Sequence, residues 1–277
     1  MKLDPRYIAA RKILLDALFA LAPHGHAIIL CGAQAIYLHT GEGDLAIAPF
    51  TTDGDLAINP SLLNDLPHLE EAMRAANFEL QSGDRFQPGI WMAPAEVDGA
   101  QIMIPVDLIV PDGVAQSGGR RGARLGVHGN RAARRTVGLE AALLDHLPMK
   151  VESLDPLDRR SILVEVAGIP ALLVAKAHKI KDRIDGAKAS RVLDKDAADI
   201  FRMMQRSDPT AISSVLRKLA GSPSAGEITV DAISILVDLF GRRGALGILM
   251  ASRALFPAFE TDTIEIICMS FISNLQK

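Results

Sequence analysis

The stretch FTTDGDLAINP, residues 50–60, carries two carboxylates, Asp53 and Asp55, in an otherwise apolar setting. In an extended strand, residues i and i+2 point to the same face, so we expect these two side chains to lie together. Two like charges at that separation are unfavourable unless a cation or a shared proton relieves them. The stretch is therefore either a solvated polar turn or half of a metal site.

A third carboxylate, Asp107, interrupts the apolar run MIPVDLIV. Burying an unpaired carboxylate is costly, so we expect it at a strand end, hydrogen-bonded, or facing a cation. Taken singly, the pair of Asp53 and Asp55 favours a solvated turn, and Asp107 favours a capped strand end. Taken together, three carboxylates supply the hard oxygen ligands that one or two Mg²⁺ or Mn²⁺ ions require, with open positions left for phosphates.

Charged residues also flank the apolar stripe of a helix predicted over 170–186, PALLVAKAHKIKDRIDG. Lys176 and Arg183 are seven residues apart, hence within about 20° of each other around the helix. Asp196 lies on the same relative flank of the next predicted helix. The alternative interpretation is boundary charges whose stems cover the core. The two expected stripes are Leu173, Ala177, Ile180 and Ile184, then Leu193, Ala197, Ile200 and Met204.

These residues fall on two halves of the chain with different patterns. The first half predicts strands over HAIILCG, TTDGDLAI, FELQ, GIWMA, AQIMIPVDLIV and SILVEVAG, with helices at the N-terminus, over AQAIYLH and over SLLNDLPHLEEAMRAANF. A Gly/Arg-rich loop is expected over 113–135. The second half predicts helices at 170–186, 191–206, 209–220, 229–240, 244–255 and 261–275. The fold class is thus α/β (α+β): an N-terminal mixed-sheet domain, 1–168, followed by an all-helical C-terminal domain, 169–277.

Composition bounds the class of protein. The 277 residues are 49% hydrophobic and 23% charged, which suits a folded core, and the net charge of −3 gives no overall attraction to nucleic acid. Cys31 and Cys268 lie in apolar surroundings and are expected to be buried thiols of a cytosolic protein. No stretch approaches the roughly 20 apolar residues of a membrane span, so we expect a cytoplasmic protein without membrane association.

The segment 113–135 is locally basic, because it has six arginines and no acid lies between Asp112 and Glu140. Such a patch can contact RNA phosphates, and the alternative is a solvated surface loop. The seven histidines show no metal-ligand spacing, and His128 is expected to face solvent. The six arginines are Arg120, Arg121, Arg124, Arg131, Arg134 and Arg135.

A strand ending in Gly32-Ala33, a helix, TxDxD from Thr51 to Asp55 and Asp107 on a later strand together resemble the polymerase-β-like nucleotidyltransferase superfamily. LLVAKAHKIKDR followed by DKDAADIFRMM resembles the AbiEii/AbiGii toxin family of nucleotidyltransferases, which includes toxins that modify tRNA acceptor ends. The resemblance covers about residues 25 to 206. Two departures are Ala33, where the family usually has Gly or Ser, and Pro49-Phe50, where members often carry a basic residue.

The resemblance implies transfer of a nucleotide from an NTP to an RNA 3′ end, with tRNA as the expected acceptor and pyrophosphate as the leaving group. It implies a Mg²⁺ or Mn²⁺ cofactor and the role of a toxin with a cognate antitoxin. The implied catalytic residues are Asp53, Asp55, Asp107, Lys176 and Asp196, with Asp199 as a further candidate, and the first three bind metal. The implied nucleotide-binding residues are Gly32, Ala33, Thr52, Lys176 and Arg183. Arg120, Arg121 and Arg124 are expected to hold RNA.

Other functions remain open on the sequence. A small-molecule nucleotidyltransferase of the aminoglycoside-modifying type, a protein-modifying nucleotidyltransferase and a non-catalytic binding protein would share the same fold core. If the transfer reaction is right, Lys176→Ala should abolish it with little loss of stability. The sequence does not identify the preferred NTP, the acceptor or the oligomeric state.

Overall fold

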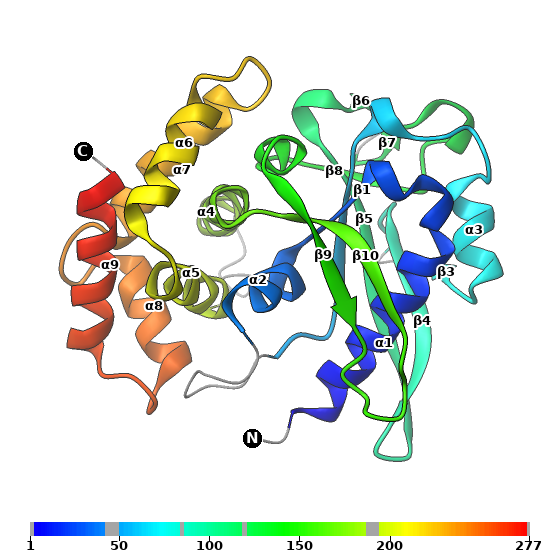
Figure 1. Cartoon of the computed structure of the whole chain (residues 1–277), viewed down its shortest axis with the longest axis horizontal. Coiled ribbons are helices and arrows are strands. Elements are labelled where there is room, and N and C mark those ends of the chain that lie inside the picture. The colour runs from blue at the N-terminus through cyan, green and yellow to red at the C-terminus, as the bar shows by residue number, and fades with distance from the viewer. Residues whose placement is uncertain (1–2, 42–49, 84–85, 118–120, 187–193, 276–277) are drawn as a thin grey trace. The chain divides into compact units, whose positions relative to one another are not determined.

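The computed structural model describes residues 3–41, 50–83, 86–117, 121–186 and 194–275. The chain divides into two units (Figure 1). The sheet unit comprises Met1–Leu38, Ala48–Thr136 and His146–Ala167, and the helical unit comprises His39–Ile47, Val137–Asp145 and Gly168–Lys277. The sequence predicts one boundary near residue 168, and it gives no sign that two earlier segments group with the C-terminal helices.

One mixed sheet organises the sheet unit, with the strand order β3-β4-β5-β2-β1-β10-β9, and β8 pairs β5 beside this path. Strand β2 runs parallel to β5 and antiparallel to β1. The strands are β1 (Ile28–Cys31), β2 (Gly54–Ile58), β3 (Glu79–Leu80), β4 (Ile90–Val97), β5 (Ala100–Pro111), β8 (Arg134–Thr136), β9 (His146–Glu152) and β10 (Ser161–Ala167). The mixed sheet predicted for the first half of the chain is therefore confirmed.

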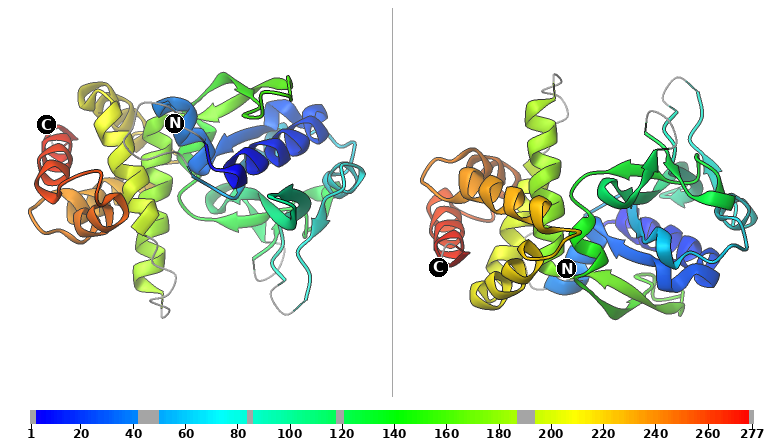
Figure 2. Two further views of the ribbon diagram at one scale, coloured as in Figure 1. Left: turned by 90° about the horizontal axis from the view of Figure 1, so that it is seen from below. Right: turned by 90° about the horizontal axis from the view of Figure 1, so that it is seen from above.

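The central strands are buried because their side chains are apolar on both faces. All four residues of β1 are buried, and helix α1 (Pro5–Ala20) packs along the sheet against β2, β4, β5 and β10 (Figure 2). Helix α2 (Gly32–Thr40) follows β1 directly. This β1–α2 turn and the start of β2 meet at the same sheet edge, since Cys31 pairs with Asp55.

Two predicted elements differ from the structure. The helix expected over 61–78 is reduced to α3 (Leu69–Ala75), preceded by a short 3₁₀ turn at Pro60–Leu62. Pro67 explains the late start, because proline lacks an amide N–H and disfavours helix in the residue before it.

The Gly/Arg-rich loop expected over 113–135 is also wrong. It contains β6 (Gln116–Ser117), β7 (Ala123–Arg124), the 3₁₀ turns Asp112–Val114 and Gly126–His128, and the start of β8. Strand β8 forms by pairing in parallel with the end of β5. That pairing depends on tertiary contact, so no local periodicity reveals it.

The helical unit contains the predicted C-terminal helices: α4 (Ile169–Asp185), α5 (Asp194–Arg206), α6 (Pro209–Ala220), α7 (Gly226–Phe240), α8 (Leu246–Leu255) and α9 (Thr261–Leu275). The stripe residues Leu173, Ala177 and Ile180 of α4 and Ile200 of α5 are buried, as expected. Asp145, from the segment before β9, fixes the start of α4, since its Oδ2 accepts from the Ala171 amide at 3.0 Å.

None of the described helices combines the length and apolar character needed to cross a membrane.

Candidate functional site

A network of buried hydrogen bonds holds the loop before β2 against α2. The Gln34 side chain donates to the Asp53 carbonyl at 3.1 Å and accepts from the Arg11 Nε at 2.6 Å. The Tyr37 hydroxyl donates to the Phe50 carbonyl at 3.0 Å. Arg11 and Gln34 are each 1% exposed, so the position of this loop is fixed by the core.

Sequence reasoning missed the role of Arg11, although a signal was present. Tyr7, Leu14 and Leu18 are buried and lie on one stripe of α1, and Arg11 occupies the i+4 position of that stripe. A charged residue on an apolar stripe needs buried polar partners. Its partners are the Gln34 side chain, the Tyr7 hydroxyl and the Glu152 carbonyl.

Asp55 lies against the first residue of α2. A Cβ atom on Gly32 would come within 2.0 Å of the Asp55 Oδ2, and Gly32 has a φ of +69°, which favours glycine. Both the close approach and the backbone conformation therefore require glycine at this position. The N-terminus of a helix favours a nearby negative charge, which suits the Asp55 carboxylate.

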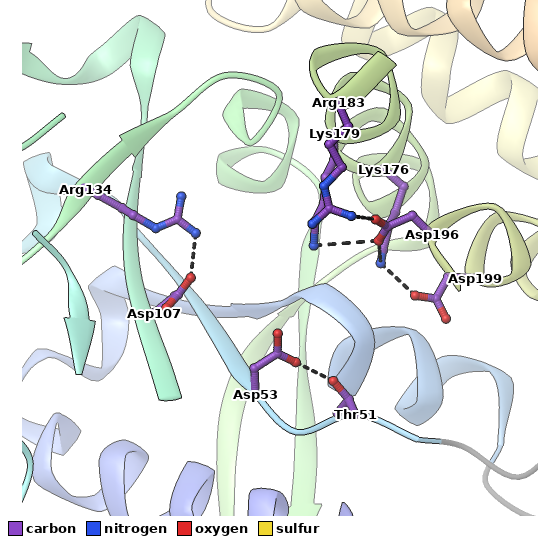
Figure 3. A network of polar contacts seen from close by, with 9 residues as sticks. All are labelled: Thr51, Asp53, Asp107, Arg134, Lys176, Lys179, Arg183, Asp196 and Asp199. Carbon is purple, nitrogen blue, oxygen red and sulfur yellow. Dashed lines mark hydrogen bonds and ion pairs between the residues drawn. The ribbon is translucent and has the colours of Figure 1, made fainter. Parts of the chain in front are cut away.

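Asp55 and Asp107 share one face of the sheet. They are in register on the adjacent parallel strands β2 and β5, and in-register neighbours point the same way. Strand β2 begins at Gly54, so Asp53 lies one residue before the strand, and its carboxylate accepts a hydrogen bond from the Thr51 hydroxyl (Figure 3). Asp53 therefore lies outside the strand that the sequence predicts for it, whereas Asp55 and Asp107 form a cross-strand pair.

Asp107 already has a cationic partner, which sequence reasoning did not assign. The Arg134 Nη2 donates to the Asp107 Oδ2 at 2.6 Å (Figure 3). Its Nη1 donates to the Thr136 hydroxyl at 2.8 Å. Burial opposes the charge of Arg134, but the negative charges of Asp107 and Asp55 outweigh it and raise the pKa of the guanidinium. Arg134 thus places a positive charge at the carboxylate pair.

Two further residues expected to bind nucleotide, Ala33 and Thr52, belong to the sheet unit. Ala33 is buried in the first turn of α2, and Thr52 is exposed in the loop before β2. Among the described residues, no three or more His, Cys, Asp or Glu side chains form a group that could hold a metal ion. Metal binding by Asp53, Asp55 and Asp107 stays a prediction.

The helical unit contains an ion cluster of its own. Lys176 Nζ on α4 lies 2.7 Å from the Asp196 Oδ1 and 2.7 Å from the Asp199 Oδ2 on α5 (Figure 3). Arg183 also forms an ion pair with Asp196, and Lys179 Nζ lies 3.7 Å from it. Thus Lys176, Arg183 and Asp196, which the sequence groups together, do meet.

The cluster is buried at its centre, where the side chains of Lys176, Asp196 and Asp199 are only 5 to 6% exposed. Burial would lower the pKa of Lys176, but the two aspartates raise it well above its usual range. Burial would raise the pKa of Asp196, but the cations around it, Lys176 foremost, hold it well below its usual range. Lys176 is therefore a paired core residue and not a boundary charge with an exposed head.

This burial changes the expectation for Lys176→Ala. Removing the ammonium would take away a buried cation that contacts two buried carboxylates, and loss of one partner of a buried ion pair is strongly destabilising. A large loss of stability is now expected. The more exposed cations of the cluster are Lys179, with 41% of its side chain exposed, and Arg183.

The five described arginines of the segment 113–135, from Arg121 to Arg135, differ in exposure. Arg120 lies outside the described residues. Arg121, Arg124 and Arg131 are exposed, with Arg121 donating to the Gln87 side chain at 3.3 Å. Arg134 and Arg135 are instead partly buried and ion-paired.

His128 is 5% exposed, so the expectation that it faces solvent is wrong. Its ring contacts the rings of His24 and His68 edge-on, with centroids 5.4 and 6.0 Å away. Its Nδ1 accepts from the Leu69 amide at 3.2 Å. Burial is the main reason that the pKa of His128 is lowered, and the two neighbouring histidines lower it further. Histidines this far apart in sequence give no spacing signal.

Comparison with known proteins adds little to this geometry. No protein-family profile matches the chain, and no curated protein matches it. Among solved structures, the chain is similar to JHP933 from Helicobacter pylori, with 12% identity and a TM-score of 0.45 over 99% of this chain and 95% of that chain. The function has to be inferred from the residues of the chain itself.

Proposed function

We propose that the protein is a divalent-cation-dependent nucleotidyltransferase that transfers a nucleotide from an NTP to a hydroxyl of an RNA end, with release of pyrophosphate. The observation that carries the proposal is the in-register pair of Asp55 and Asp107, next to the glycine turn at Gly32. Such a pair beside a helix N-terminus suits a cation and the phosphates that accompany it.

The donor set of the sheet unit fits Mg²⁺ or Mn²⁺. Mg²⁺ is usually held by one or two carboxylates, with waters and substrate phosphates completing its coordination, so a group of three protein ligands is not required. Asp55 and Asp107 would hold the ion, with Asp53 as a further candidate. Arg134 supports the expectation that Asp55 and Asp107 accommodate a cation, because its guanidinium is 2.6 Å from the Asp107 carboxylate. When bound, the ion would offset charge on the attacking and leaving oxygens.

The nucleotide phosphates need further partners. In the sheet unit, the backbone at Gly32 and Ala33 begins a helix, and helix N-termini bind phosphate through free amide groups. In the helical unit, Lys176 Nζ contacts Asp196 and Asp199, and nucleotide binding by Lys176 and Arg183 stays a prediction. We therefore propose that Lys176 holds the side chains of Asp196 and Asp199 in position.

The acceptor proposal depends on the exposed arginines. Arg124 lies on β7 and Arg121 just before it, both are exposed, and β7 follows β5, the strand that carries Asp107, in the chain. Exposed guanidinium groups suit RNA phosphates. The further proposal that the protein acts as a toxin with a cognate antitoxin, in the cytoplasm, rests on the resemblance described above.

The experiment that tests the proposal offers each of four [α-³²P]NTPs, with Mg²⁺, to total tRNA, to an aminoglycoside and to a mixture of proteins. Label is expected on tRNA and is expected to disappear in Asp55→Asn and Asp107→Asn. Asp112→Asn is the matched control, because Asp112 lies just after β5 and pairs with Arg135. Label on the aminoglycoside or the proteins alone would reject the RNA acceptor, and no label on any acceptor would contradict the transfer reaction.

A further inference from the structure

Arg134 occupies an unusual position for a basic residue in a region expected to bind RNA. Its side chain is 23% exposed and its two terminal nitrogens donate to Asp107 and Thr136. Its Nε is buried and has no hydrogen-bond partner among the described residues. The guanidinium therefore uses only part of its donor capacity, although it is largely withdrawn from solvent.

The strand register aims Arg134 at the carboxylate pair. Arg134 is in register with Ile109 on β5, and Asp107 lies two residues before Ile109, so Arg134 and Asp107 share a face. Asp55 is in register with Asp107 on the other side of β5. One guanidinium thus faces two carboxylates, and the set has a net charge of about −1.

The adjacent residue provides an internal comparison. Arg135 is on the same strand, is 25% exposed and also has a buried Nε without a partner among the described residues. Its guanidinium pairs with Asp112 at 3.2 Å, away from Asp55 and Asp107. Arg134 and Arg135 therefore match in charge, strand and exposure but differ in the carboxylate they contact.

Two cations cannot share the same carboxylate oxygen at contact distance without repulsion. An ion bound at Asp55 and Asp107 would compete with Arg134 for the Asp107 Oδ2. An arginine released from a carboxylate retains a planar set of donors that matches phosphate. The nucleotide triphosphate that accompanies the ion offers such oxygens.

We propose that Arg134 is the resident counter-ion of the Asp55–Asp107 pair and that it exchanges partners on substrate binding. Its guanidinium leaves Asp107 and binds the polyphosphate of the nucleotide. This inference rests on the proposed function, because it takes the carboxylate pair as the cation site. Arg134 then makes binding specific for phosphate. It also opposes binding of a cation that arrives without a nucleotide.

The test measures binding of Mn²⁺ alone and of magnesium pyrophosphate alone by calorimetric titration, without any turnover. In Arg134→Gln, the affinity for Mn²⁺ should rise about tenfold, because a positive charge beside the ligands is removed. The affinity for pyrophosphate should fall about tenfold, because a charge-assisted contact is lost. In the control Arg135→Gln, which has the same change of net charge, both affinities should stay within about twofold.

Arg134→Lys keeps the charge and tests the proposal if the glutamine variant does not fold. It should retain the wild-type affinity for Mn²⁺ but bind pyrophosphate more weakly, because lysine lacks the bidentate geometry. Equal Mn²⁺ affinity in wild type and Arg134→Gln, or unchanged pyrophosphate affinity in Arg134→Lys, would overturn the role of Arg134 and leave the proposed function standing. Absence of Mn²⁺ binding in the wild-type protein and in every variant would contradict the proposed function as well.

Discussion

The buried ion cluster of the helical unit gives a quantitative prediction for Lys176→Met. Methionine preserves the length of the side chain but removes the ammonium that contacts Asp196 and Asp199, each at 2.7 Å. Removing one partner of a buried ion pair costs about 3–5 kcal/mol of unfolding free energy, because the remaining charge is left in a poorly solvated site. Asp196 keeps its ion pairs with Arg183 and Lys179, and a second variant tests the contribution of Asp199.

The second variant removes one of the two carboxylates that Lys176 contacts. Lys176→Met combined with Asp199→Asn takes away a buried negative charge that has lost its contact with the ammonium, and it should recover at least about 1 kcal/mol relative to the single variant. The matched control is Lys181→Met on the same helix, because Lys181 and Asp185 form an exposed i,i+4 pair with both side chains more than half exposed. Exposed pairs of this kind contribute about 0.5 kcal/mol or less.

Urea unfolding followed by far-ultraviolet circular dichroism measures all four proteins. The expected order of stability is wild type, then Lys181→Met close to it, then the double variant, then Lys176→Met. A loss below about 1 kcal/mol in Lys176→Met would refute the reasoning, because the ammonium would then be replaceable by solvent. A double variant no more stable than Lys176→Met would show that the charge of Asp199 does not depend on the ammonium of Lys176.

Three further predictions concern the sheet unit. Gly32→Ala should displace the Asp55 carboxylate and add left-handed strain of about 1–2 kcal/mol, so Mn²⁺ affinity and thermal stability should both fall, and normal Mn²⁺ titration would contradict the close approach at Gly32. The pKa of His128 in the folded protein lies below its ordinary value of 6.5, so the unfolded chain takes up a proton at a higher pH than the folded protein does. The free energy of unfolding should therefore fall as the pH drops below about 6.5. Unfolding measured between pH 7.5 and 5.5 should show this dependence, and it should be weaker in His128→Gln. Arg121→Ala with Arg124→Ala should weaken tRNA binding and lower its salt slope by about 0.7 per lost phosphate contact in a filter-binding titration, and an unchanged slope would make β7 a solvated connector.

The helices of the C-terminal half could be predicted because their signals are local. Apolar residues at spacings of three and four predict helices at α4, α5 and α6. Gly186 marks the end of α4 and Pro209 marks the start of α6, so the predicted bounds lie close to the observed ones. The short strand β8 could not be predicted, because Arg134, Arg135 and Thr136 carry no apolar alternation. They become a strand only by pairing with the end of β5.

The candidate site also combines features that the sequence predicts with features that it does not. The types and order of Gly32, Asp55 and Asp107 are visible in the sequence, and strand periodicity places Asp107 in β5. What the sequence lacks is the register between strands, which makes Asp55 and Asp107 neighbours and leaves Asp53 outside the strand. For the same reason, the partner of Asp107 could not be chosen among six nearby arginines.

The proposed reaction is tested most directly by comparing two labels in one NTP. With tRNA and Mg²⁺, label from [α-³²P]NTP should become attached to the RNA, while label from [γ-³²P]NTP should appear only in pyrophosphate, and both should depend on Asp55 and Asp107. Phosphate transfer from the γ position, or α-label transfer that persists at the wild-type rate in Asp55→Asn and Asp107→Asn, would contradict nucleotidyl transfer at this carboxylate pair.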